Sequence, residues 1–146
     1  MYTYYTKEGK FLVKEYDEIP YNKLYRKVGP SLIYHDGSKA WYKKGKPHRK
    51  DGPAYIGNNG DKEWWVNGKW HRTDGPAFDG KYGDKEWYIN GRLHRLDGPA
   101  VIRGEKNQWW VNGKRLNKKE VEIWIKDNNI NLKTKEHQAL FMLKFG

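Results

Sequence analysis

The stretch "WWVNGKWHRTDGPA", residues 64–77, decides how the chain folds, because it recurs. "WYKKGKPHRKDGPA" spans residues 41–54, and "WYINGRLHRLDGPA" spans residues 87–100. The histidines of the three copies occupy positions 48, 71 and 94, so each lies 23 residues after the last. Active sites seldom come in series, whereas a fixed period of this length is typical of repeat architectures, in which each unit packs against its neighbours. The stretch is therefore interpreted as a building block.

Incomplete copies flank the three full ones. "YRKVGPS", residues 25–31, is a degenerate copy of "HRKDGPA", and "WWVNGKRLN", residues 109–117, keeps only the front half of the unit. We therefore expect a single domain with repeats over residues 21–117, an N-terminal β-hairpin cap over 1–20 and a C-terminal helical cap over 118–146.

Composition limits the classes of function. The 146 residues are 16% aromatic and contain no cysteine, so rings must supply much of the core and disulfides are excluded. No apolar stretch is typical of a signal peptide or a membrane span, which predicts a soluble, cytoplasmic protein. The net charge is +11, and residues 37–116 hold 17 lysines and arginines against 9 acidic residues. Such a balance favours an anionic partner, although a lysine-rich soluble surface would give the same count.

Asn-Gly pairs predict where each unit turns. Asn67-Gly68, Asn90-Gly91 and Asn112-Gly113 suit the centre of a two-residue type I′ hairpin, and Lys44-Gly45 is a weaker version. The "DGPA" that follows ends the hairpin, and a spacer such as "FDGKYGD" leads to the next unit. The expected cross-strand pairs in the second copy are Val66 with Lys69, Trp65 with Trp70, Trp64 with His71, and Glu63 with Arg72.

The two ends differ from the repeats. The segment "YYTKEGKFLVKEY" predicts an extra hairpin that turns near Glu8-Gly9. After residue 117 the pattern becomes helical, with Asn117 as the N-cap and Glu120 as its capping-box partner. The inward residues of this helix are expected to be Val121, Trp124 and Ile125. A second helix is expected from Thr134, with Ala139, Leu140 and Leu143 facing inward and Phe141 as a further candidate.

The fold class that follows is mainly β: an array of 23-residue antiparallel β-hairpin repeats with a small C-terminal α-helical cap. The unit resembles the MORN repeat, in which an aromatic residue precedes Trp-x-x-Gly-x-x-His, and "WYING" followed by "RLH" matches this part. Arg95 stands where the usual unit has Gly, and "LDGPA" adds a residue before its Gly; this departure resembles the HRxDGPA-rich variant common in phage and giant-virus proteins. The resemblance covers roughly residues 20–117. It implies scaffolding or protein contact and, in some proposals, lipid contact, but not an enzyme.

The recurring histidines and tryptophans are interpreted as structural. Each histidine lies opposite a tryptophan, and Leu116 takes the histidine position opposite Trp109, so an imidazole is not required there. Equivalent residues of successive hairpins lie about 10 Å apart, too far to share one zinc ion. We expect no metal and no cofactor. The structural repeat residues are Trp41, His48, Trp64, His71, Trp87, His94 and Trp109.

The arginines, lysines and Trp70 allow either a structural role or a role in binding. Arg72 and Arg95 are expected to pair with Glu63 and Glu86 across the hairpin, whereas Arg49 faces Ala40 without a partner. Trp70 either stacks on Trp65 or offers a platform for a nucleic-acid base. The binding candidates are Arg49, Lys43, Lys44, Lys46, Trp70, Arg72 and Arg95.

No residue is predicted to be catalytic, since Ser31 and Ser38 are the only serines and neither lies in a nucleophile motif. The "HRxD" copies lack every other kinase element. The sequence therefore favours a non-enzymatic binding protein, a small phage or viral protein that binds a host macromolecule in the host cytoplasm. The alternative is a binder of an anionic ligand, nucleic acid or a signalling nucleotide, through the basic, aromatic repeat surface. A protein partner is favoured; membrane insertion is not expected, and the oligomeric state is left open.

Overall fold

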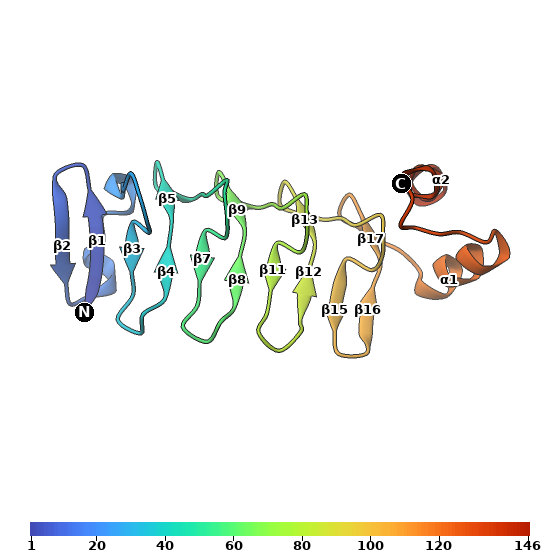
Figure 1. Ribbon diagram of the computed structural model, residues 1–146, viewed down its shortest axis with the longest axis horizontal. Helices are drawn as coiled ribbons and strands as arrows, with labels where there is room; N and C mark the ends of the chain where they lie inside the picture. The colour runs from blue at the N-terminus through green and yellow to red at the C-terminus, as the bar shows by residue number, and fades with distance from the viewer.

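The computed structural model describes residues 1–146 and sets antiparallel hairpins side by side along its longest axis in two rows (Figure 1). A ten-stranded sheet forms the first row, in the order β16-β15-β12-β11-β8-β7-β4-β3-β1-β2. Its strands are β1 (Tyr2–Thr6), β2 (Gly9–Val13), β3 (Leu32–Ile33), β4 (Lys39–Ala40), β7 (Tyr55–Ile56), β8 (Lys62–Glu63), β11 (Phe78–Asp79), β12 (Lys85–Glu86), β15 (Val101–Arg103) and β16 (Lys106–Gln108). Short two-stranded hairpins form the second row: β5 (Tyr42–Lys43) with β6 (Lys46–Pro47), β9 (Trp65–Val66) with β10 (Lys69–Trp70), β13 (Tyr88–Ile89) with β14 (Arg92–Leu93), and β17 (Trp110–Val111) with β18 (Lys114–Arg115). The prediction of a mainly β fold with antiparallel hairpins and two C-terminal helices is confirmed.

Positive backbone angles fix the turns of the second row. Asn67 and Gly68 have φ of 51° and 76°, and the equivalent pairs at Lys44-Gly45, Asn90-Gly91 and Asn112-Gly113 have similar values. These are the angles that a type I′ turn requires at both central residues. The predicted pairs of Trp65 with Trp70 and of Val66 with Lys69 are therefore present.

The ten-stranded sheet was not predicted. The segments interpreted as spacers fold back as hairpins of their own, so β11 pairs with both β12 and β8. The predicted pairing of Glu63 with Arg72 is wrong, because Glu63 lies in β8 and pairs with Phe78 and Tyr55. The chain changes rows at Trp64, whose N–H donates to the carbonyl of Ala77 at 2.7 Å.

Aromatic rings of the second row pack against one another and against the sheet. Trp70 lies 4.1 Å from Trp65, 5.6 Å from Tyr88 and 6.2 Å from Phe78, measured between ring centroids. These rings are half-buried, as expected for a chain in which 16% of the residues are aromatic. The contact between Trp65 and Trp70 across the hairpin is the packing alternative that the sequence allowed.

The predicted N-terminal hairpin is present as β1 and β2, which turn at Lys7-Glu8. Two 3₁₀ turns follow, η1 (Tyr16–Glu18) and η2 (Tyr21–Lys23). They bring Ile19 and Leu24 onto Leu32 and Ala40 to form a small buried cluster beneath the first strands. This cluster holds the segment with η1 and η2 against the sheet.

The C-terminal helices are α1 (Lys118–Asp127) and α2 (Lys135–Phe145). The side chains of Asn117 and Thr134 accept hydrogen bonds from the N–H groups of Glu120 and His137. The predicted N-cap at Asn117 is therefore confirmed, and Thr134 is the N-cap of the second helix. The helices pack on the last hairpin and form the largest buried cluster, to which Trp124 and Ile125 add partly buried side chains: Trp109, Val111, Leu116, Val121, Leu132, Phe141 and Phe145. Neither helix has the length and apolar character needed to cross a bilayer.

The inward face predicted for α2 is wrong. Ala139, Leu140 and Leu143 are exposed, the last by 84%, whereas Phe141 is fully buried. Residues 139–143 are all apolar, so their periodicity does not select a face. Side-chain packing selects the buried face of α2 instead: the ring of Phe141 lies between the rings of Trp109 and Trp124, with centroid distances of 5.8 and 6.1 Å.

This assignment predicts unequal costs for two truncations on α2. Phe141→Ala should lower the free energy of unfolding by about 3–5 kcal/mol, because it empties a closed aromatic cluster. Leu143→Ala is the matched control and should change it by less than about 0.5 kcal/mol. Urea unfolding followed by tryptophan fluorescence measures both, and equal losses would show that α2 is turned the other way.

Candidate functional site

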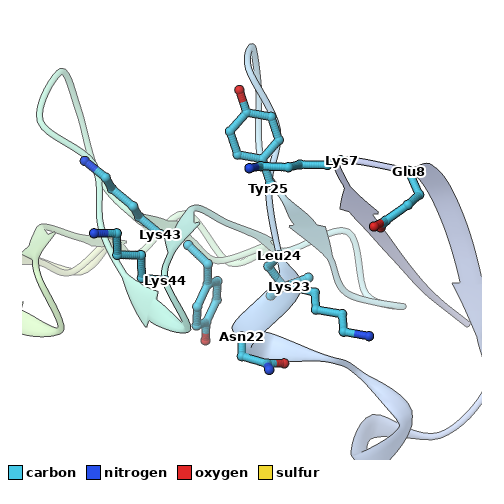
Figure 2. Close-up of a pocket in the computed structure, with 9 residues that line it drawn as sticks. Lys7, Glu8, Asn22, Lys23, Leu24, Tyr25, Lys43 and Lys44 are labelled. Carbon is cyan, nitrogen blue, oxygen red and sulfur yellow. The ribbon is translucent and has the colours of Figure 1, made fainter.

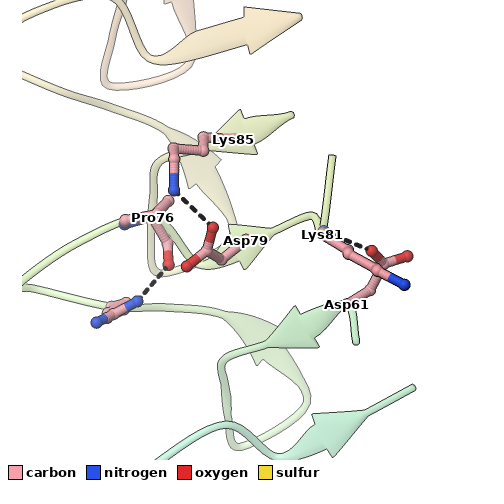
Figure 3. A network of polar contacts seen from close by, with 6 residues as sticks. Asp61, Pro76, Asp79, Lys81 and Lys85 are labelled. Atoms are coloured by element: carbon pink, nitrogen blue, oxygen red, sulfur yellow. Dashed lines mark hydrogen bonds and ion pairs between the residues drawn. The ribbon is translucent and has the colours of Figure 1, made fainter. Parts of the chain in front are cut away.

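The arginine of each HRxDGPA segment is held inside the fold. The guanidinium of Arg72 stacks 3.8 Å above the ring of Trp64, and its Nε donates to Asp74 at 2.8 Å. Its Nη1 donates to the carbonyl of Pro76 at 3.1 Å, the bond drawn at Pro76 in Figure 3. The hydrogen bond and the charge of Arg72 lower the pKa of Asp74. The same three contacts recur around Arg49 with Trp41, Asp51 and Pro53, and around Arg95 with Trp87, Asp97 and Pro99.

This stack explains the identity of other residues in the HRxDGPA motif. A Cβ on Gly75 would lie 2.8 Å from Cζ of Arg72, closer than carbon atoms approach, so glycine leaves room for the guanidinium. Ala77 has no exposed surface, and its carbonyl accepts the bond from Trp64 that joins the two rows. The residue between the arginine and the aspartate is exposed in the first two copies, as Lys50 and Thr73, whereas Leu96 of the third copy is partly buried against the C-terminal cluster.

Two predicted ion-pair assignments are corrected by these contacts. Arg49 was expected to lack a partner, but it pairs with Asp51 at 3.0 Å. Arg72 pairs with Asp74 and Arg95 pairs with Asp97, each two residues later in the chain, and not with Glu63 and Glu86. Glu63 accepts a hydrogen bond from the indole N–H of Trp65, and burial raises its pKa. Glu86 pairs with Arg103 and accepts from the hydroxyl of Tyr88. The error arose from extending the hairpin register past the point where the chain changes rows.

The degenerate copy at residues 25–31 keeps part of the arrangement. Arg26 stacks 3.9 Å above the ring of Tyr5 and donates to the carbonyl of Pro30 at 3.2 Å. Val28 replaces the aspartate, so no ion pair forms there. The stack therefore forms here without a carboxylate, on a ring that β1 supplies.

The histidines point to successive turns and do not converge. Nδ1 of His48 accepts the N–H of Asn67 at 3.0 Å, and His71 and His94 do the same for Asn90 and Asn112. Each imidazole thus fastens one hairpin of the second row to the next. Burial lowers the pKa of His48 and of His94, and the charges of Lys43 and Lys50 lower that of His48 further. No group of three or more histidine, aspartate or glutamate side chains lies close enough together to hold a metal ion.

Hollows lie between successive HRxDGPA segments, with volumes of about 600 and 570 Å³. Each is lined by two of the arginines and by the aspartate bonded to each of them, so the charges nearly cancel. Neither hollow contains a free cationic fork for a phosphate or carboxylate.

A third hollow, the lysine hollow, is different in charge. Its volume is about 440 Å³ and it opens between the β1–β2 turn, η2 and β5 (Figure 2). Leu24, Tyr25 and Tyr42 supply its apolar lining. Four lysines and one glutamate complete the wall: Lys7, Lys23, Lys43, Lys44 and Glu8.

The lysines of this hollow have no acidic partner. None of them takes part in an ion pair, whereas the HRxD arginines all do. Glu8 receives a hydrogen bond from the hydroxyl of Thr6, which lowers its pKa, and the charges of Lys23 and Lys7 lower it further. With four ammonium groups against one carboxylate, the hollow is a site of positive potential open to solvent.

The structure divides the predicted binding residues into two groups. Lys43 and Lys44 line the lysine hollow, and Lys46 lies exposed nearby with its aliphatic stem against Gly68. The other candidates, Arg49, Arg72, Arg95 and Trp70, are engaged in the stacks and ring contacts described above.

Sequence reasoning missed Lys7 and Lys23. Lys7 lies in the β1–β2 turn, and Lys23 precedes the first recognisable copy of the motif at residues 25–31. The packing of η2 against the β5–β6 turn brings Lys23 to Lys43; the backbone of Asn22 there approaches within 3.4 Å of where a Cβ on Gly45 would be. The basic composition around residues 43–50 was the one signal that pointed to this region.

The packing of Gly75 beneath Arg72 yields a double-mutant prediction. Gly75→Ala should destabilise the protein by about 1–3 kcal/mol, because its methyl group collides with the guanidinium. In an Arg72→Ala background the same change should cost much less, so the two costs are not additive. Chemical denaturation of the two single variants and the double variant measures this, with Thr73→Ala as a control of little effect; simple additivity would refute the stacking role.

The histidine bonds predict a loss of stability in mild acid. Because the folded pKa of His48 and of His94 lies below the ordinary 6.5, their contribution is complete above that value and is lost as the pH falls through the lowered pKa. Unfolding free energies should therefore decrease between about pH 7.5 and about pH 5.5. The double variant His48→Leu/His94→Leu, in which leucine takes the histidine position as Leu116 does in the last unit, should show a flatter profile over this range; an unchanged slope would assign the effect to other groups.

No family model matches the chain, and neither a curated protein nor a solved structure shows significant similarity to it. The function must therefore be argued from the side chains.

Proposed function

We propose that the chain is a non-enzymatic repeat protein of MORN-like type, with a 23-residue hairpin unit, that binds an acidic surface of a protein partner through the lysine hollow. The observation that carries the proposal is that four lysines surround one open hollow without acidic partners, while the arginines and histidines of the repeats are engaged inside the fold. In keeping with the resemblance, we extend the proposal to a small phage or viral protein whose partner is a host macromolecule.

The choice of a protein partner over nucleic acid rests on what the hollow lacks. Lysine is a compact point charge that pairs with carboxylates at many angles, whereas phosphate recognition commonly uses the planar fork of arginine. Single-stranded nucleic acid also needs exposed rings for base stacking. Most rings of the repeats pack on each other or beneath an arginine, and Tyr25 is the one aromatic residue of the hollow with substantial exposure.

A nucleic acid or a nucleotide is the second candidate, supported by the charge and by Tyr25. Binding to nucleic acid and binding to a protein partner should differ in their dependence on salt concentration. Neutralisation of phosphates by about four lysines predicts a slope near −3 for log K against log salt on single-stranded DNA. Contacts to a shaped protein surface add apolar burial and give a weaker dependence.

A charge-reversal experiment tests the proposal. Lys23→Glu/Lys43→Glu should lower the affinity for a labelled oligoglutamate peptide at least tenfold, because it turns the hollow acidic, whereas the matched reversal Lys114→Glu/Lys119→Glu at the far end should lower it only slightly. Fluorescence anisotropy with the peptide and with single-stranded DNA of equal charge measures both. Equal losses from the two reversals would show that only net charge matters, and a preference for DNA with the steep slope would establish the second candidate.

A further inference from the structure

The ten-stranded sheet ends in an uncovered strand. β2 is the outermost strand of the order and stands at one end of the row (Figure 1). Residues 9–12 are all exposed, including Phe11 by 40% and Leu12 by 59%. With five residues it is as long as β1 and longer than any other strand of the sheet, and it contains no proline. A long edge that lacks proline is a template for another strand, and Lys10, the one charged residue in β2, limits the registers in which such a strand can pair.

The backbone groups available on this edge can be identified. Tyr5 of β1 donates its N–H to Ser31 and accepts at its carbonyl from Tyr25, so its hydrogen-bonding groups face away from β2. Lys10 is the partner of Tyr5 in the β1–β2 ladder. Because opposite residues of an antiparallel ladder alternate between bonded and non-bonded pairs, Lys10 and Leu12 direct their N–H and C=O groups to the open side.

Only one self-pairing register suits the charges. Antiparallel pairing that sets Lys10 of one copy opposite Leu12 of the other places Phe11 on the two-fold axis. Just beyond the strand ends it also sets Glu8 opposite Lys14, and Lys7 opposite Glu15. A shift by two residues in either direction, the smallest that keeps the bonded positions facing, sets Lys10 opposite Lys10 or Lys14, and directly opposed like charges are unfavourable.

The same register extends an aromatic stack. Phe11 already lies on Tyr4 of β1, with ring centroids 5.3 Å apart and planes inclined by 15°. At the two-fold axis the two Phe11 residues would form a non-bonded pair, the position at which side chains across a ladder are closest. The rings would then run in the order Tyr4, Phe11, Phe11, Tyr4 across the junction, which covers the most exposed ring of the hairpin.

We propose that two copies of the chain pair antiparallel through β2, about a two-fold axis at Phe11, and join their ten-stranded sheets into one continuous sheet. This surface lies at the end of the sheet, away from the HRxDGPA segments. It shares Lys7 and Glu8 with the rim of the lysine hollow, but the backbone pairing of β2 uses neither residue, and sedimentation measures it without any ligand. A two-fold contact of this kind is self-complementary. Assembly through β2 stops at the dimer, because the pairing occupies the β2 edge of each copy.

Sedimentation equilibrium of the full chain over a concentration series tests the dimer. The wild type should rise toward twice the monomer mass, whereas Leu12→Pro, which removes an outward N–H and no bond to β1, should stay at the monomer mass with an unchanged circular dichroism spectrum. A wild type that remains monomeric throughout, or a dimer that Leu12→Pro leaves intact, would overturn the proposal.

A charge exchange tests the register and does not depend on the behaviour of the proline variant. Glu8→Lys alone sets two lysines opposite each other at both ends of the junction and should weaken dimerisation at least tenfold. Adding Lys14→Glu restores opposite charges and should recover most of the loss. Low ionic strength should enlarge both effects. If the second substitution recovers nothing, the pairing does not use this register.

Discussion

A guanidinium stacked on a tryptophan ring holds the bend between the two rows of hairpins in each of the three full HRxDGPA copies. The stack at Arg72 and Trp64 places the Nη1 group against the carbonyl of Pro76, and that contact positions Ala77 to accept the N–H of Trp64. Cation–π contacts of this kind contribute roughly 0.5–2 kcal/mol each. Their repetition along the chain matters more than any single value, because the hairpins are too short to be stable alone. The rest of the structure depends on these joints.

The joints also determine what is left for function. An arginine that stacks, pairs with aspartate and donates to a carbonyl has little capacity for a ligand, and an imidazole whose Nδ1 accepts a turn N–H is held in one tautomer. Four lysines without an acidic partner gather where the N-terminal segment meets the first hairpin of the second row. This is why the residues that look most like an active site in the sequence are the ones least available for chemistry, and why the candidate site lies beside the repeats.

The sequence predicted the local features well because each has a short-range cause. Asn67-Gly68 specifies its turn by backbone angles, and Asn117 and Thr134 specify helix starts by a single side-chain bond. The sheet escaped prediction because its strands of two or three residues, such as Lys62–Glu63, are too short and polar to show an alternating pattern. Gly60 and Gly83, both at positive φ, were the available signal for its turns. The face of α2 and the lysine hollow depend on contacts between distant segments, which no local pattern encodes.

The central claim is that the HRxDGPA residues join neighbouring hairpins instead of forming a reactive site. The most direct test is the tautomer of each of the three histidines in these segments. A long-range ¹H–¹⁵N correlation spectrum, recorded at a pH where imidazole is neutral, reports which ring nitrogen carries the proton. The structure predicts that His48, His71 and His94 all hold the proton on Nε2 and leave Nδ1 as the acceptor for a turn amide. A proton on Nδ1 in these residues, or three dissimilar ring environments, would contradict it.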